Sequence, residues 1–274
     1  MRANRRTRWL IFAVLCGFTA VNMVPIVWAV LTSIKLPIDA FSIPPKLIFA
    51  PTLIFHEQVW VEKAFWVYLL HTLVISVSTV VISVSIGTMA AYGISRMRNR
   101  NSRGLLFGLL AMRMFPQILL AIPFFMLARF AGLIDTYWAM ILAMIAINQP
   151  FTIWLMRSFF LDVPAELYES AAIDGCGAWQ SFWRIALPVV LPGMWVTALF
   201  SLLLAYNEFL FALVLTGPHT KTLPVAIAEY GGEDINYWSL SAAAAVGIML
   251  PIMGFMALMQ RYLVRGMTLG AVKG

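Results

Sequence analysis

Residues 169–188, ESAAIDGCGAWQSFWRIALP, form a polar, interrupted segment in a chain that is otherwise almost continuously apolar. The segment lies between two hydrophobic stretches, each long enough to cross a bilayer. Its composition favours a helix up to Gly175, so we predict a short amphipathic helix held outside the bilayer. Such a helix has to dock on another surface.

The composition is that of an integral membrane protein. The chain has 274 residues, of which 62% are hydrophobic and 11% are charged, and its mean hydropathy is +0.87. A soluble domain with this composition would aggregate. Because about 20 apolar residues cross a bilayer as a helix, we predict an all-α, polytopic membrane protein that forms a single transmembrane domain, residues 1–274. Six transmembrane helices are predicted, near residues 9–31, 67–92, 105–127, 138–159, 189–214 and 240–262.

The first of these stretches is too long for the apolar core of a signal peptide, and no small-residue cleavage site follows it. We therefore expect it to be retained as a membrane span.

The basic residues indicate how the chain is oriented. Most of them lie on one side of the predicted spans: Arg2, Arg5, Arg6 and Arg8; Arg96, Arg98, Arg100 and Arg103; Arg157 and Arg184; Arg261, Arg265 and Lys273. By the positive-inside rule, both termini and the segment near 165–186 are cytoplasmic. Orientation therefore explains the net charge of +7 better than nucleic-acid binding does.

The sequence contains no motif that indicates an enzyme. Cys16 and Cys176 are far apart and lack the spacing of metal ligands, so we expect neither a disulfide nor a metal site. Walker, CxxC, HExxH and GxSxG patterns do not occur in the sequence. We expect a chain that is not an enzyme and binds no cofactor of its own.

Helix-breaking prolines occur within several predicted spans: Pro116, Pro123, Pro150 and Pro251. In lipid, the carbonyl group that a proline frees must be satisfied by a neighbouring helix or by water. We therefore expect these spans to pack in a bundle or to line a cavity.

Four stretches resemble one family of transport proteins. The first is Glu169 through Gly175 followed by Leu187 and Pro188, with Ser170 where the family usually has Ala. The others are AAYGISR at residues 90–96, YNEFLFALVLT at residues 206–216 and RGMTLGAVKG at residues 265–274. The chain resembles the permeases of ATP-binding-cassette importers, in the branch that includes the second membrane subunit of maltose and glycerol-phosphate importers.

The resemblance implies a permease subunit of an ATP-driven, binding-protein-dependent importer for a sugar or sugar derivative, located in the bacterial inner membrane. It forms half of a translocation path, and residues 165–186 carry a cytoplasmic coupling helix. The implied partners are a second, different permease chain, a cytoplasmic ATPase dimer that binds ATP and Mg, and an extracytoplasmic solute-binding protein. The alternative is an ion-gradient-driven carrier or channel, but no internal repeat supports it.

The residues expected to couple the chain to the ATPase are Glu169, Ala171, Ala172, Ile173, Asp174, Gly175, Leu187 and Pro188. The three residues 171–173 would offer a small apolar surface to a cleft on the ATPase, and Glu169 would meet a basic group there. Gly175 permits a backbone turn that a side chain would hinder. Leu187 and Pro188 fix the entry into the fifth span, since proline is tolerated in the first turn of a helix.

Candidates for the translocation path are Arg113, Gln117, Asn148, Asn207 and Glu208. A carboxylate within a span is costly and usually faces protein or water, so Glu208 either supports the bundle or takes part in gating or substrate contact. Arg113 either pairs with Glu208 or offers a cation to an anionic substrate, because a guanidinium can bind two oxygens at once.

Overall fold

The computed structural model describes residues 5–97, 100–230 and 235–269, which contain helices and no strand. The all-α prediction is confirmed. In chain order the elements are α1 (Arg5–Ser33), α2 (Pro37–Ala40), α3 (Ile54–Glu57), the π-helical turn η1 (Gln58–Glu62), α4 (Phe65–Arg96), α5 (Arg100–Met114), α6 (Gln117–Phe130), α7 (Tyr137–Leu161), α8 (Ala165–Ile173), α9 (Ala178–Ser181), the π-helical turn η2 (Phe182–Ala186), α10 (Leu187–Tyr206), α11 (Leu210–Leu215), α12 (Leu223–Ala228) and α13 (Ile235–Leu269). Arg2, Arg98 and the last five residues of the C-terminal motif lie outside the described residues.

Five of the described helices are long and apolar enough to cross a membrane, or six spans if one bent pair is counted as a single span. The chain divides into two compact units. The smaller unit comprises Met1–Trp66 and Ala226–Leu250, and the larger comprises Val67–Val225 and Pro251–Gly274.

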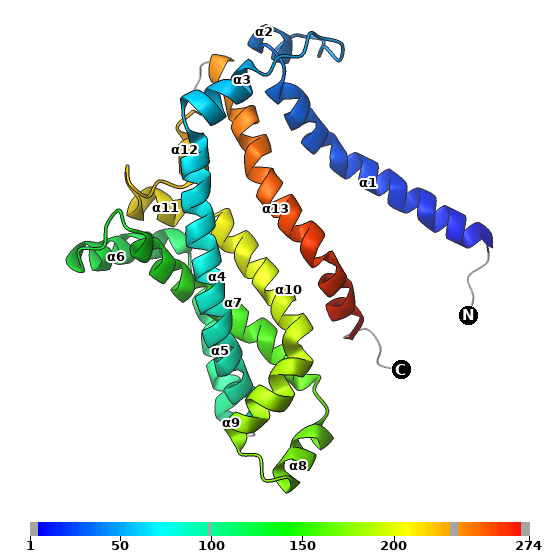
Figure 1. Cartoon of the computed structure of the whole chain (residues 1–274), viewed down its shortest axis with the longest axis vertical. Coiled ribbons are helices and arrows are strands. Elements are labelled where there is room, and N and C mark those ends of the chain that lie inside the picture. The colour runs from blue at the N-terminus through cyan, green and yellow to red at the C-terminus, as the bar shows by residue number, and fades with distance from the viewer. Residues whose placement is uncertain (1–4, 98–99, 231–234, 270–274) are drawn as a thin grey trace. The chain divides into compact units, whose positions relative to one another are not determined.

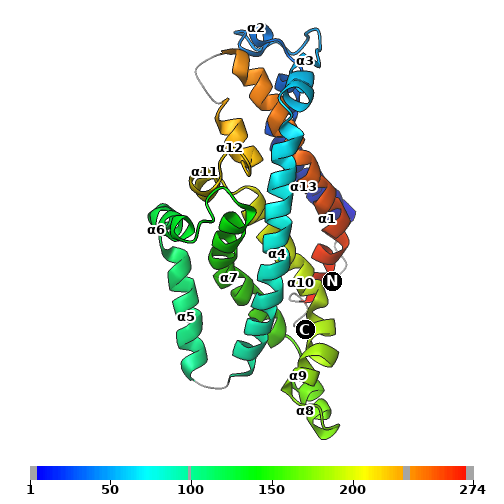
Figure 2. The ribbon, with the colours of Figure 1, turned by 60° about the vertical axis from the view of Figure 1, so that its left-hand side comes forward.

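Helices α4, α7 and α10 form the centre of the larger unit and lie side by side in both views (Figures 1 and 2). Two glycines allow these helices to approach closely. A Cβ atom on Gly87 would lie 2.5 Å from Cγ2 of Thr152, and one on Gly193 would lie 2.4 Å from the ring of Phe159. Small residues are the usual means by which membrane helices pack tightly.

Buried hydroxyl groups connect the same three helices. The Oγ1 atom of Thr152 lies 3.1 Å from Oγ of Ser201 and 3.4 Å from Oγ of Ser83, and Nε2 of Gln149 donates to the Ser83 carbonyl at 3.1 Å. These bonds satisfy polar groups that the interior would otherwise leave without partners. They tie α4 and α10 to α7.

The third predicted span is not one straight helix. Helices α5 and α6 are separated by Phe115 and Pro116, and the two helices are bent by 92° at this break. Proline lacks an N–H group, and its ring disfavours the helical conformation of the residue before it. By contrast, Pro123, Pro150 and Pro251 lie inside helices.

The fifth predicted span also differs from the structure. The helix begins at Ala178, well before Leu187, and it ends at Tyr206. Residues 207–209 then interrupt the helix before α11 begins. The expected span over residues 189–214 is therefore shifted toward the coupling segment, because η2 continues the helical backbone through Leu187, whose N–H bonds to the carbonyl of Phe182.

Asp135 connects two loops of the larger unit. Its carboxylate accepts bonds from the backbone N–H groups of Gly217 (2.8 Å), His219 (3.2 Å) and Thr220 (3.0 Å), and from the Thr220 hydroxyl (2.8 Å). Burial alone would raise the pKa of Asp135, but the bonds from Thr220, His219 and Gly217 together outweigh burial and hold this pKa below its usual value.

The smaller unit contains α1, whose membrane-length apolar window has no buried residue. A buried lysine, Lys35, follows this helix and is only 1% exposed. Its Nζ lies 4.9 Å from the ring centroid of Trp28 and 4.7 Å from that of Phe49, and it donates to the Lys46 carbonyl at 2.6 Å. The aromatic rings and the carbonyl together stabilise the buried charge.

Candidate functional site

Helix α8 lies at one end of the larger unit, and α6 and α11 lie toward the other end (Figures 1 and 2). One face of α8 is fixed to the bundle, because Tyr168 and Ala171 are buried. The Tyr168 ring lies below the guanidinium of Arg96, with 4.2 Å between Cζ and the ring centroid. It belongs to an apolar cluster that also includes Phe160 and Phe182.

The rest of α8 and the residue that ends it are exposed. Glu169, Ala172, Ile173 and Asp174 all lie on the surface, and Ile173 is 87% exposed. Ala171 was predicted to belong to this surface, but it is buried. It follows Tyr168 by three residues, and residues at this spacing share one face of a helix.

Gly175 ends α8 with the turn that the sequence predicted. Its φ of +79° lies in the left-handed region, which is unfavourable for residues with a side chain. The N–H of Gly175 donates to the Ala172 carbonyl at 3.1 Å, and the N–H of Cys176 donates to the Ala171 carbonyl at 2.8 Å. This pair of bonds is a Schellman motif, which satisfies the last carbonyl groups of a helix.

Beyond Gly175 the chain returns to the bundle through α9. The Tyr92 hydroxyl donates to the Ala178 carbonyl at 3.3 Å, and η2 then leads into α10. Leu187 and Pro188 therefore lie inside a continuous helical segment, rather than at the first turn of an isolated span.

Tyr168 remains protonated at neutral pH. Burial raises the pKa of Tyr168 above its usual value, and the neighbouring Tyr92 raises it further, while Arg96 opposes the change. Its role is consequently that of an aromatic surface beneath a cation.

Two of the candidate path residues, Asn207 and Glu208, bond to nearby backbone groups. Glu208 accepts a bond from the Phe211 N–H at 3.0 Å, and the Asn207 side chain donates to the Leu203 carbonyl at 2.9 Å. Glu208 thus satisfies a free amide near the start of α11. Asn148 is 1% exposed within α7, and its side-chain nitrogen has no bonding partner among the described residues.

Arg113 and Glu208 do not form the ion pair that the sequence left open. The Arg113 guanidinium instead lies over the ring of Phe151, 5.3 Å from Cζ to the centroid. Arg113 and Gln117 line a cavity of about 140 Å³ at the bend between α5 and α6.

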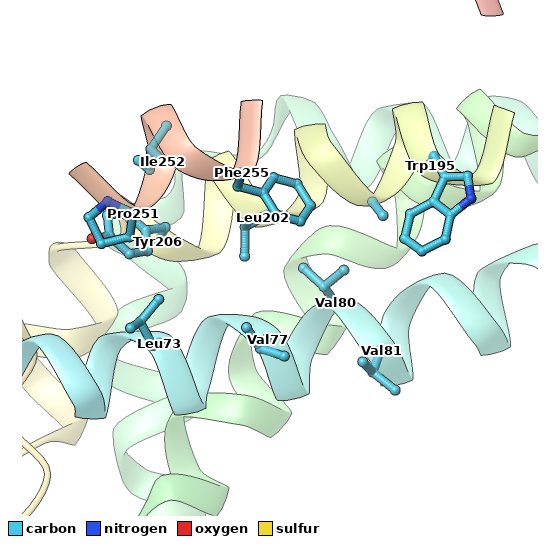
Figure 3. A pocket seen from close by; sticks show the side chains of 11 residues that line it. Leu73, Val77, Val80, Val81, Trp195, Leu202, Tyr206, Pro251, Ile252 and Phe255 are labelled. Carbon is cyan, nitrogen blue, oxygen red and sulfur yellow. The ribbon is translucent and has the colours of Figure 1, made fainter. Parts of the chain in front are cut away.

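A larger cavity of about 280 Å³ lies among α4, α10 and the part of α13 that belongs to the larger unit. Figure 3 shows its lining, with Val77 and Val80 on α4, Leu202 on α10 and Phe255 on α13. Because its walls are almost entirely apolar, this cavity lacks the polar groups that orient a hydrophilic solute.

The sequence did not predict the two residues whose contact holds α8 against the bundle, Arg96 and Tyr168. Arg96 was noted for its charge in the orientation of the chain and as part of a family motif, and Tyr168 was not singled out. An available signal was the spacing of Tyr168 and Ala171, which predicts a shared helix face. Nothing in the sequence indicated that this face would meet Arg96.

Residues 83–269, more than half of the chain, match a family model. The family is described as "Binding-protein-dependent transport system inner membrane component". The chain belongs to this family. The matched residues include the coupling segment and all five path candidates.

Several relatives are similar to this chain over nearly its full length. A probable ABC transporter permease of Sinorhizobium fredii is 38% identical over 272 residues, which are 99% of this chain and 97% of the relative. A trehalose transport system permease of Mycobacterium tuberculosis is 32% identical over 279 residues, covering 100% of both chains. A diacetylchitobiose uptake system permease of Streptomyces coelicolor is 32% identical and covers 91% of each chain.

Solved importer structures share the fold. A chain of a bacterial ABC transporter that imports the acidic polysaccharide alginate matches with a TM-score of 0.67 and 17% identity, covering 93% of this chain and 96% of that chain. A MetNI methionine transporter chain matches with a TM-score of 0.58 and 19% identity, covering 74% and 94%. The protein is thus an inner-membrane permease component of a binding-protein-dependent transport system, and the comparisons support this function rather than an ion-gradient-driven carrier.

Proposed function

We propose that this permease forms half of the translocation path for a sugar or sugar derivative and is driven by a cytoplasmic ATPase dimer through α8. The observation that carries this proposal is that α8 has one face buried against the bundle and an apolar residue exposed on another face. Tyr168 and Ala171 anchor one face, while Ile173 extends from the other face with 87% of its surface exposed. An apolar side chain exposed beside Glu169 and Asp174 suits a protein interface with a charged rim.

The proposed machinery has three further parts. A second, different permease chain would complete the path, and the unburied apolar window of α1 leaves surface for contact with that chain and with lipid. A solute-binding protein would deliver the sugar from outside. ATP and Mg would bind to the ATPase, since this subunit's proposed task is to transmit movement.

The named substrates of the relatives support a sugar. The Mycobacterium tuberculosis relative belongs to a trehalose system and the Streptomyces coelicolor relative to a diacetylchitobiose system. The positive-inside pattern supports an orientation with both termini in the cytoplasm. This orientation would place α8 on the same side as the ATPase.

We assign separate roles to the coupling residues. Glu169, Ala172, Ile173 and Asp174 would contact the ATPase, whereas Ala171 would hold α8 against the bundle. Gly175 would set the turn out of α8. Leu187 and Pro188 would lie in the helical segment that receives the movement.

The test replaces the exposed apolar side chain of Ile173 by a charged one. Ile173→Asp should leave membrane insertion unchanged and reduce both uptake and binding-protein-stimulated ATP hydrolysis at least tenfold in reconstituted vesicles. The matched control is Ile48→Asp, because Ile48 is likewise an exposed isoleucine, at 96%, and belongs to the smaller unit rather than to the unit that contains α8. Uptake and stimulated hydrolysis by Ile173→Asp equal to those of the control would refute the role of α8.

A further inference from the structure

A small cavity lies at the bend between α5 and α6. It has a volume of about 140 Å³. Its lining includes Phe115, Phe124 and Pro150, and among the described residues that line it Arg113 alone has an ionic side chain. Gln117 adds an amide group to the same wall.

No Asp or Glu is found among the described residues that line this cavity with Arg113. Its guanidinium lies over Phe151, and Glu208 is engaged by the Phe211 N–H. Phe151 is close to the middle of α7, which spans residues 137–161, so Arg113 lies well away from both ends of that span. A cation at this depth is costly unless it faces protein, water or a ligand, and such residues commonly mark a solute path.

The same wall includes the residue at the start of α6. Gln117 is the first residue of α6, and the preceding Pro116 makes no side-chain capping bond. The first N–H groups of a helix have no partners within it and carry a partial positive charge. At α6 the Leu119 N–H already donates to the Pro116 carbonyl at 3.1 Å. Arg113 and the Gln117 amide are therefore the groups on this wall that favour a negatively charged group, beside the positive end of α6.

We propose that this cavity is an anion subsite on the translocation path and that it takes the carboxylate or sulfonate group of an acidic sugar derivative. Arg113 would bind two oxygens of that group, as its planar donors allow, and Gln117 would bond to an adjacent hydroxyl. The rings of Phe115 and Phe124 offer apolar surface to the sugar ring. The assignment rests on the proposed function as a sugar importer.

The transport test compares matched acidic and neutral sugars. The complete complex in proteoliposomes is given a panel of labelled glycosides in pairs, each uronic acid or sulfonated sugar with its neutral counterpart. We expect import of at least one acidic member in preference to its partner. Arg113→Gln should reduce that import at least tenfold, and Arg113→Lys should reduce it less. Arg129→Gln is the matched control, since Arg129 is exposed in the last turn of α6.

A chemical protection test detects binding without transport. Phenylglyoxal modification of Arg113 and Arg129 in the assembled complex is followed by mass spectrometry, with methyl glucuronide or methyl glucoside as the probe. The glucuronide should protect Arg113 several-fold and leave Arg129 unprotected, whereas the glucoside should protect neither residue.

The outcomes separate the two proposals. Import of neutral sugars alone, or an equal loss of acidic and neutral import in Arg113→Gln, would overturn the anion subsite and leave the sugar importer standing. Equal modification of Arg113 with both probes would also overturn the subsite. ATP-dependent import of no sugar of either kind would remove the proposed function itself, and the subsite with it.

Discussion

The Arg96 guanidinium covers the ring of Tyr168, with its Cζ 4.2 Å from the ring centroid. Arg96 is the last residue of α4, and Tyr168 is in the middle of α8. One contact therefore joins a central helix of the larger unit to the segment that we propose as the docking site of the ATPase. The position of α8 depends on this contact and on the apolar cluster around it.

Replacing Tyr168 by Ala should detach α8 from the bundle. Loss of a buried aromatic side chain typically lowers the free energy of unfolding by about 3–5 kcal/mol. Tyr168→Phe keeps the ring beneath Arg96 and should retain nearly full stability and coupled uptake. Thermal unfolding in detergent and the ratio of uptake to ATP hydrolysis in vesicles measure the two effects. Full coupling in Tyr168→Ala would show that the contact does not position α8.

Substitution of Gly175 should act through the backbone alone. No atom lies within 4 Å of a Cβ atom built at this position, but its φ of +79° strains any residue with a side chain. Gly175→Val should therefore misdirect the chain after α8 and reduce coupled uptake. Gly175→Asn should be milder, because Asn adopts left-handed conformations more readily. Uptake and stimulated hydrolysis provide the comparison, and equal effects of Val and Asn would argue against a conformational cause.

Glu208 should tolerate Gln better than Ala. The bond from the Phe211 N–H needs an oxygen acceptor, which Gln keeps and Ala removes. Glu208→Ala should destabilise the start of α11 by about 1 kcal/mol, the usual cost of losing a capping acceptor, and Glu208→Gln should retain most uptake. Thermal unfolding and uptake are to be measured for both variants. Loss of uptake in Glu208→Gln without a change in unfolding would assign the charge itself to gating or transport.

Asp135 should make the stability of the larger unit depend on acidic pH. The pKa of its carboxyl is lowered in the folded protein, so its contribution is fully present above the ordinary value near 3.8 and is lost as the pH falls through the folded-state pKa. Asp135→Asn should lower the unfolding temperature at neutral pH. Its difference from the unmodified protein should shrink as the pH is lowered to about 3. A difference that stays constant over this range would contradict the assignment to ionised Asp135.

The sequence predicted those parts of the fold that depend on local chemistry. Membrane-length apolar stretches identified the helices, and Gly175 correctly marked a turn. The 92° bend could not be predicted from Pro116 alone, because Pro123 and Pro150 are also prolines and yet lie inside helices. The outcome at each proline depends on which neighbouring helices can satisfy the freed carbonyl group.

Long-range partners explain the remaining differences. Arg113 and Glu208 were opposite charges within two predicted spans, but Glu208 bonds to a nearby backbone amide while Arg113 lies against an aromatic ring. Likewise, the burial of Ala171 depends on contacts that bring α8 to the end of α4. Residue spacing indicated which side chains share a face, but packing determined which face is buried.

The helical segment from Ala178 to Tyr206 is continuous, with no loop between its two ends. Its 29 residues correspond to a length of about 43 Å at 1.5 Å per residue. The π-helical turn η2 adds a local change of register without interrupting the backbone bonds. A displacement applied beside α8 can therefore travel along one stiff element to the break at residues 207–209. A movement at the α8 end of this segment is therefore linked to a movement at Tyr206. Removing or inserting one residue would rotate one end of the helix relative to the other by about 100° and so change the direction of the movement at the far end.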